Sequence, residues 1–248
     1  MLNSAHIPDY GHLAAQLNYQ YAAKQGYSFH VERSPTNFEI EHGLFDPDNE
    51  YTFVWSKPGL LRRHAAVYDY VLFLDSDAVV MDLTLSVPAL FAAAGPECCM
   101  LLQEDCKALL ANGKKQCWQE GTYNTGIVAV RCTPIAQAIL ATWQQAALNE
   151  CQTWQHKHTR EQACLNFLRP SLPPGALEFL PFDVFGNPEG MGIRHFAGTS
   201  ATARKRIFAK LLQDRGLIAQ KTPSYAPWGI LLGLLSGLAL LCLLVLNR

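Results

Sequence analysis

The chain has 248 residues, and its 20 Lys and Arg residues nearly balance its 21 Asp and Glu residues, which leaves a formal net charge of −1. This length suffices for one α/β domain with a sizeable core, and the balanced charge without a long basic run argues against a nucleic-acid-binding surface. The eight cysteines, all but Cys242 outside the apolar C-terminus, favour an oxidising lumen. Small buried thiols without disulfides are the alternative interpretation.

The chain is expected to open on a helix over residues 9–26, because Leu13, Leu17 and Tyr21 share one face and Gly26 is suited to the C-cap. Residues 27–31 alternate between apolar and polar side chains and predict a strand. Parallel α/β domains usually open on a strand, and the loop that follows it often binds phosphate or a base. The order of a helix and then a strand therefore predicts a domain that lacks its first strand.

A polar loop is expected over residues 35–50, and a helix over residues 55–67 follows it. Residues 71–74 are continuously apolar, which is typical of a short strand buried on both faces. This strand leads directly into Asp75-Ser76-Asp77, and a second apolar run covers residues 78–81. Two carboxylates between two apolar runs are costly unless a cation or hydrogen bonds compensate them.

Asp75-Ser76-Asp77 is the candidate metal site. Because side chains alternate along an extended chain, Asp75 and Asp77 can face the same side while Ser76 turns away or bonds to backbone. Carboxylate oxygens suit Mg²⁺ or Mn²⁺, and cations held by one or two carboxylates commonly bridge to substrate phosphates. A solvated turn is the alternative interpretation, since Asp-x-Asp also occurs by chance.

The rest of the domain alternates strands with helices, which predicts an α/β fold with a mainly parallel sheet. The expected elements are strands at 100–102, 127–130 and 177–180, helices at 86–94, 134–149 and 160–168, a closing segment at 193–198, and a basic helix at 204–217.

Residues 228–246 carry no charged side chain and are almost wholly apolar. About 19 residues at about 1.5 Å each match a hydrocarbon core of about 30 Å, so we expect a C-terminal transmembrane helix, with a buried core helix as the alternative. Gly229, Gly233 and Gly237 form a Gly-x-x-x-Gly face suited to dimer formation. The expected division is a domain over 1–217, a linker over 218–227 and a membrane helix over 228–246.

Several short motifs follow one another over residues 18–198. They are Asn18-Tyr19-Gln20-Tyr21-Ala22 with Gly26-Tyr27, Trp55-Ser56-Lys57, residues 70–81 with Asp75-Ser76-Asp77, Asn124-Thr125-Gly126 with Val130-Arg131, Glu161-Gln162, and His195-Phe196-Ala197-Gly198. In this order they resemble the glycosyltransferases of GT-A fold, and most closely the galactosyltransferase/xylosyltransferase family (glycosyltransferase family 34). The resemblance implies a three-layer α/β/α domain, a nucleotide-diphosphate sugar as donor, a glycan acceptor and transfer with retention of the α configuration.

The resemblance also implies roles for individual residues. Asp75, Asp77 and His195 would hold Mn²⁺ or Mg²⁺ on the diphosphate of the donor. The donor would also be bound by Lys57, Ser76, Gly126 and Gly198. Asn124, Glu161 and Gln162 would line the reacting face, where glycosyl transfer needs a polar group near an oxocarbenium-like centre.

The sequence departs from this family in several places. Glu161 stands where the family usually has Asp, and the basic residue expected after the His-Gly segment is either Arg204 or Lys205. Family members are anchored in the Golgi membrane at the N-terminus, whereas the expected anchor here is C-terminal. We therefore expect a signal peptide and the missing strand upstream of Met1, and an active site in the Golgi or ER lumen; a chain that starts at Met1 would leave it in the cytosol.

Two other functions fit parts of the sequence. A membrane-tethered, inactive transferase-like domain that acts as a partner fits the missing first strand. A haloacid-dehalogenase-type phosphatase fits Asp75-Ser76-Asp77-Ala78-Val79 after an apolar strand, but the paired acidic motif expected downstream is not evident. Taken alone, His195 is typical of a core histidine, Asn124-Thr125-Gly126 of a turn, and Glu161-Gln162 of a solvated helix face.

Overall fold

The computed structural model describes residues 7–46, 50–109, 115–155, 157, 159–180, 184–186, 192–217 and 241–246. The helices are α1 (Ile7–Gln25), α2 (Asn37–Glu41), α3 (Ser56–Ala65), α4 (Val87–Ala94), α5 (Pro134–Ala146), α6 (Arg160–Leu168) and α7 (Ala201–Asp214). The strands are β1 (Ser28–Glu32), β2 (Tyr70–Leu74), β3 (Ala78–Val80), β4 (Met100–Glu104), β5 (Cys106–Leu109), β6 (Lys115–Cys117), β7 (Tyr123–Arg131), β8 (Leu177–Phe179), β9 (Phe185–Gly186), β10 (Ile193–His195) and β11 (Leu241–Leu246). Short 3₁₀ turns are η1 (Glu50–Trp55), η2 (Gln152–Trp154) and η3 (Arg169–Ser171).

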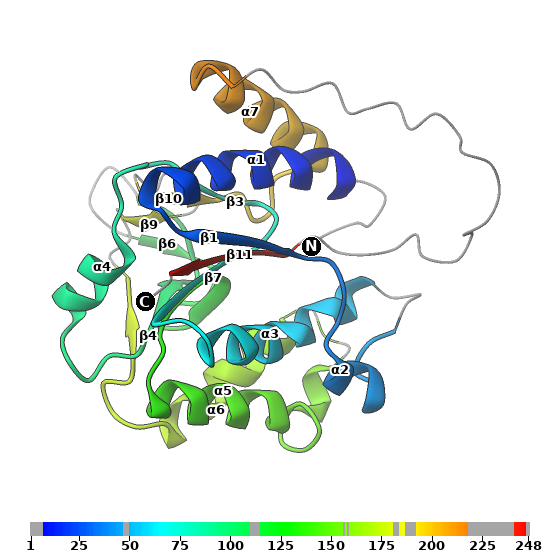
Figure 1. The fold of residues 1–248 in the computed structure, drawn as a ribbon. Helices are drawn as coiled ribbons and strands as arrows, with labels where there is room; N and C mark the ends of the chain where they lie inside the picture. The colour runs from blue at the N-terminus through cyan, green and yellow to red at the C-terminus, as the bar shows by residue number, and fades with distance from the viewer. Residues whose placement is uncertain are drawn as a thin grey trace.

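A six-stranded sheet with the order β1-β11-β2-β7-β4-β8 forms the middle layer of the molecule. Helices α1 and α7 lie over one face of this sheet, and α3, α5 and α6 lie over the other (Figure 1). Both faces of β2 are covered, because Val71, Leu72, Phe73 and Leu74 are all buried. The α/β fold with three layers is therefore as predicted.

The sheet is not mainly parallel, and this part of the prediction is wrong. Strand β7 pairs antiparallel with both β2 and β4, and within this sheet only β4 and β8 pair in parallel. A parallel neighbour requires a crossover connection, usually a helix, whereas antiparallel neighbours need only a short link. Between β4 and β7 the described chain forms the β5–β6 hairpin instead of a helix, so β7 runs back along β4.

The end of the C-terminal apolar run differs from the prediction of a helix. Leu241–Leu246 forms strand β11, which pairs antiparallel with β1 on one side and β2 on the other, and is not the end of a membrane helix. Two strand neighbours satisfy the backbone hydrogen bonds of a six-residue apolar segment, and apolarity alone does not distinguish a buried strand from a helix. Residues 218–240, with the expected linker and glycine face, lie outside the described residues. No helix among the described residues is long and apolar enough to cross a membrane.

The predicted polar loop over 35–50 contains structure that the sequence analysis missed. Helix α2 begins after Thr36, which forms a capping box with Glu39, and the backbone N–H of Thr36 donates to Glu39 Oε2 at 2.9 Å. The pattern Thr36-x-x-Glu39 is the sequence signal for such a start. The other predicted helices and strands are found within a few residues of their expected limits, and β4 and β7 are longer than predicted.

The cysteines divide into disulfides and thiols. Cys106 pairs with Cys117 across the β5–β6 hairpin, and Cys151 pairs with Cys164, which joins the segment after α5 to α6. Among the described residues Cys98, Cys99 and Cys132 are free thiols. The described cysteines thus include both disulfides and free thiols, and the compartment of the domain stays a prediction.

Candidate functional site

Strand pairing brings the predicted motifs to one place. The backbone N–H of Asp75 donates to the carbonyl of Gly126 at 2.8 Å, where β2 meets β7. The N–H of Phe196 donates to the carbonyl of Asp77 at 2.9 Å, because β10 pairs with β3 in a separate small sheet. The acidic segment therefore lies between β7 and β10, although these strands are far apart in the sequence.

Helix α1 holds the strand that follows the acidic segment. Asn18 is completely buried, its Nδ2 donates to the carbonyl of Ala78, and its Oδ1 accepts from the N–H of Val80, both at 2.9 Å. A buried amide with both ends paired to backbone fixes β3 at this position. Asn18 of the first motif thus fixes β3, the strand that directly follows Asp77.

Asp75, Asp77 and His195 converge, and each offers a ligand atom within 4.8 Å of the others. The Asp77 and His195 side chains are almost fully buried, whereas the Asp75 side chain is 21% exposed. Nδ1 of His195 is buried and has no hydrogen-bond partner among the described residues. Two carboxylates and an imidazole suit Mn²⁺ or Mg²⁺, so the residues fit the metal that the resemblance implies.

Gly126 makes room for the imidazole of His195. A Cβ atom at this position would lie 2.1 Å from Cε1 of His195, so the imidazole would have to move. The glycine of the Asn124-Thr125-Gly126 motif is therefore needed for close approach of the ring to β7. Contact of Gly126 with a donor sugar stays a prediction.

Asp77 is held by Arg204 of α7 and by His195 of β10. Nη2 of Arg204, on the first turn of α7, lies 2.7 Å from Asp77 Oδ2, and Nε2 of His195 lies 3.3 Å from Asp77 Oδ1. Burial by itself would raise the pKa of Asp77, but His195 and Arg204 outweigh it and hold that pKa well below its usual range. Of the two basic residues considered, Arg204 is the one at the site, since its side chain is buried whereas Lys205 is exposed.

Asp75 is held from the opposite layer by Lys57 of α3. The Lys57 Nζ lies 3.3 Å from Asp75 Oδ1, 2.8 Å from Glu161 Oε1 and donates to the carbonyl of Thr125 at 2.8 Å. Burial would lower the pKa of Lys57, yet Asp75 and Glu161 outweigh this effect and raise it. For Asp75, burial dominates over the attraction of Lys57 and raises the pKa of the carboxyl. Lys57 and Glu161 thus form a buried charge pair, and their contact with a donor or a reacting face stays a prediction.

Asn124 and Gln162 meet at a third residue that the sequence analysis did not select. Asn124 Nδ2 donates to Asp105 Oδ1 at 3.0 Å, and Gln162 Nε2 donates to Asp105 Oδ2 at 3.1 Å. Gln162 Oε1 also accepts weakly from the N–H of Thr125 at 3.3 Å. The signal for Asp105 was its place directly after strand β4, at the same sheet edge as the acidic segment. Asp105 therefore positions Asn124 and Gln162, two of the three side chains that were predicted to line the reacting face.

Ser76, the middle residue of the acidic segment, and Gly198, which follows β10, were both predicted to bind the donor. Ser76 Oγ is buried and has no partner among the described residues. Gly198 has a φ of +73° and forms a turn in which the N–H of Thr199 donates to the carbonyl of Phe196 at 3.1 Å. Their contact with a donor stays a prediction.

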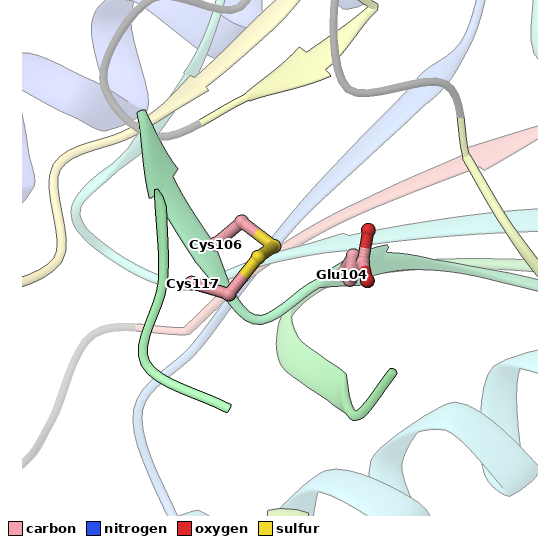
Figure 2. A group of neighbouring side chains, drawn as sticks. All are labelled: Glu104, Cys106 and Cys117. Atoms are coloured by element: carbon pink, nitrogen blue, oxygen red, sulfur yellow. A yellow bond between two sulfur atoms is a disulfide. The ribbon is translucent and has the colours of Figure 1, made fainter. Parts of the chain in front are cut away.

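Glu104, Cys106 and Cys117 form another group of potential ligand atoms. Figure 2 shows the two sulfur atoms joined in a disulfide beside Glu104. Disulfide sulfurs offer no thiolate, which is the form of cysteine that binds metals. Among the described residues this leaves Asp75, Asp77 and His195 as the metal-binding candidate.

Comparisons with known proteins agree at the level of the fold. No family model matches the chain, and no curated protein sequence matches it. A solved structure, "Crystal structure of a glycosyltransferase involved in the glycosylation of the major capsid of PBCV-1", superposes with a TM-score of 0.57 at 18% sequence identity, over 81% of this chain and 92% of that one. At this identity the likeness shows that the two proteins share a fold.

Proposed function

We propose that this protein is a retaining glycosyltransferase that uses Mn²⁺ to move a hexose or pentose from a nucleotide-diphosphate sugar to a glycan hydroxyl. The convergence of Asp75, Asp77 and His195 carries the proposal, because these residues come from segments that only the fold unites. The glycosyltransferase fold of a solved structure supports it. The more specific relation to the galactosyltransferase/xylosyltransferase family rests on the motifs.

A divalent cation bound by these three residues would supply Lewis-acid stabilisation of the negative charge that develops on the departing diphosphate. The chain prepares this site with fixed charges. Arg204 and Lys57 keep Asp77 and Asp75 close to each other despite their mutual repulsion. Asp75, the more exposed of the two carboxylates, faces the solvent from which the donor arrives.

The reaction exchanges one C–O bond for another. The acceptor hydroxyl oxygen bonds to the anomeric carbon while the bond from that carbon to the phosphate oxygen breaks, and the hydroxyl proton passes to the departing phosphate. Gln162 is held by Asp105 and the Thr125 backbone, so its amide presents a fixed dipole to the developing positive charge at the sugar. Asn124 is fixed by the same Asp105.

A lumenal location is part of the proposal. The disulfides Cys106–Cys117 and Cys151–Cys164 support it, because disulfides persist in oxidising compartments and are rare in the cytosol. Thiol labelling of protein freshly isolated from cells checks this: these four cysteines should resist alkylation until a reductant is added. Labelling of all four without reductant would place the domain in a reducing compartment.

The metal is tested by Mn²⁺ binding, followed by electron paramagnetic resonance in the presence of nucleoside diphosphates. We expect His195→Gln and Asp75→Asn to weaken Mn²⁺ binding and to reduce nucleotide-sugar turnover by about 100-fold or more. Lys210→Gln, an exposed substitution on α7, serves as the control, and thermal melting checks that each variant is folded.

Different outcomes identify different functions. Wild-type protein that binds neither Mn²⁺ nor any nucleotide sugar would favour the inactive-domain alternative. Release of inorganic phosphate from phosphomonoesters, without sugar transfer, would favour the phosphatase.

A further inference from the structure

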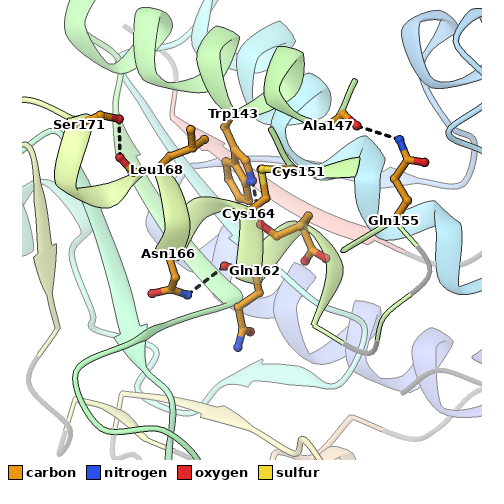
Figure 3. The surroundings of a disulfide bond; sticks show 10 residues. Trp143, Ala147, Cys151, Gln155, Gln162, Cys164, Asn166, Leu168 and Ser171 are labelled. Carbon is orange, nitrogen blue, oxygen red and sulfur yellow. Dashed lines mark hydrogen bonds between the residues drawn. A yellow bond between two sulfur atoms is a disulfide. The ribbon is translucent and has the colours of Figure 1, made fainter. Parts of the chain in front are cut away.

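A cavity of about 450 Å³ opens beside Gln162, on the side of α6 that faces away from the Cys151–Cys164 disulfide. Figure 3 shows the Gln162 and Asn166 side chains on this side of the helix. The walls come from the loop after β6, from η2 and from α6. This volume lies within the range of small-molecule sites in proteins, which is roughly 300–1,000 Å³.

Two aromatic rings form one wall of the cavity. Trp154 of η2 and Phe167 of α6 both line it, and their ring centroids are 5.2 Å apart at an interplanar angle of 52°. Phe167 is 52% exposed, so an apolar ring face is available to a ligand. A pyranose ring carries a face of C–H bonds, and these pack against aromatic rings by burying apolar area and by meeting the negative ring face.

The remaining lining is polar and nearly without charge. Among the described residues that line the cavity, Arg169 is the only charged one. Its guanidinium lies 4.6 Å from the Tyr123 ring centroid and donates to the carbonyl of Gly121 at 2.7 Å. Asn166 Nδ2 donates to the carbonyls of Tyr123 and Gln162, both at 2.9 Å. The amides and hydroxyls of the lining are neutral, and Arg169 already contacts Gly121 and Tyr123. This lining suits a neutral ligand rich in hydroxyl groups rather than a phosphate or an acidic peptide.

Gln162 connects this cavity to the metal site. Its side chain lines the cavity and is bonded to Asp105 and the Thr125 backbone, while Thr125 also bonds Lys57, the partner of Asp75. A sugar seated against Phe167 can therefore present a hydroxyl group to the amide at which the proposed transfer takes place.

We propose that this cavity binds the acceptor as a neutral oligosaccharide, with a sugar ring stacked on Phe167 and Trp154. The role of the bound sugar as acceptor rests on the proposed function, whereas carbohydrate binding by the cavity can be measured without any turnover. Phe167 selects for a ring with an apolar face, and the neutral lining selects against charged glycans.

The experiment measures binding of neutral gluco-, xylo- and galacto-oligosaccharides to the full chain by saturation-transfer NMR and tryptophan fluorescence. We expect at least one of these oligosaccharides to bind. Phe167→Ala and Phe167→Leu should weaken its binding by about tenfold, whereas Phe167→Tyr should bind like the wild type because the aromatic ring is kept. Tyr19→Ala is the matched control. Tyr19 is 60% exposed and pairs with Phe29 at 6.0 Å, but on α1, across the sheet from α6 (Figure 1).

Donor hydrolysis without acceptor is measured in parallel and should be the same in the wild type and in the exposed control Lys210→Gln. The inference is overturned if no neutral oligosaccharide binds, if Phe167→Leu binds like the wild type, or if an acidic peptide binds more tightly. Carbohydrate binding that depends on Phe167, in a protein that turns over no nucleotide sugar, would overturn the proposed function and leave the cavity as a carbohydrate site.

Discussion

Asp75 and Asp77 are separated by one residue, yet they differ in solvent exposure and in the basic side chain that contacts each of them. Asp77 is closed from solvent and lies against Arg204 of α7, in the layer that covers one face of the sheet. Asp75 keeps 21% of its side chain exposed and lies against Lys57 of α3, in the layer on the other face (Figure 1). The acidic segment is thus the point at which the two helical layers meet.

At the proposed metal site, the difference means that the two carboxylates would respond differently to a cation. His195 and Arg204 outweigh burial and hold the pKa of Asp77 well below its usual range, which favours the charged carboxylate. Burial instead raises the pKa of Asp75, and a carboxylate that is costly to charge is the one that gains most from an arriving cation. Asp77 is thus held in place by Arg204, whereas Asp75 would gain the more from a bound cation.

The largest expected effect is on the Asp75 side. Lys57→Met should lower the free energy of unfolding by about 3–5 kcal/mol, because it leaves Asp75 and Glu161 buried without a cation. Urea denaturation measures this, and Lys210→Met is the control, since the exposed Lys210–Asp214 pair contributes only about 0.3–0.5 kcal/mol. Adding Glu161→Gln to Lys57→Met should recover part of the loss, and a loss below 1 kcal/mol would contradict the charge-pair interpretation.

On the Asp77 side the equivalent change should cost less. Arg204→Met should lower the free energy of unfolding by about 2–3 kcal/mol, because it removes the buried cation beside Asp77 but leaves the His195 contact in place. The same denaturation experiment tests it. A loss greater than that of Lys57→Met would reverse the order of the two sides.

Gly126→Ala tests the close approach of β7 and His195. The added Cβ would overlap the imidazole, so we expect a loss of about 1–3 kcal/mol in stability together with weaker Mn²⁺ binding. Calorimetric titration with Mn²⁺ measures the second effect. Gly216→Ala is the matched control, because Gly216 has a positive φ of +69° but no atom within 4 Å of an added Cβ; it should cost stability through backbone strain alone and leave Mn²⁺ binding unchanged. Unchanged Mn²⁺ binding in Gly126→Ala would show that His195 is not a ligand.

The smallest effect is expected at Glu32, which is a carboxylate between two basic groups but lies nearer the surface than Asp75 and Asp77. The hydrogen bond from His64, and Arg63 with it, outweigh burial and lower the pKa of Glu32 to about 2. A lowered pKa stabilises the fold above the unfolded value of about 4.3, and this stabilisation is lost as the pH falls through about 2. Glu32→Gln should therefore cost about 1 kcal/mol at pH 7, and the difference from wild type should shrink between pH 4.5 and 2. A difference that is constant with pH would show that charge plays no part.

The candidate site was predicted from sequence to the extent that its residues lie next to an apolar strand. Asp75 and Asp77 stood out because charge directly follows a run that must be buried, and His195 was found only through the order of the motifs. Asp105 was not selected, because its place directly after strand β4 was its only signal in the sequence, and its partners Asn124 and Gln162 are evident only in the fold. Arg204 could not be separated from Lys205 for the same reason.

By itself the sequence determined the helices other than α2 and most strands, because periodicity, caps and apolar runs are local properties of the chain. The three layers were expected only through the resemblance to a known fold. Only the tertiary structure decided the direction of β7, which follows from the hairpin before it. It also decided the state of Leu241–Leu246, which pair with β1 and β2 as a strand. An apolar segment satisfies its backbone hydrogen bonds either within a helix or with neighbouring strands, and which of these it finds depends on what the rest of the fold places beside it.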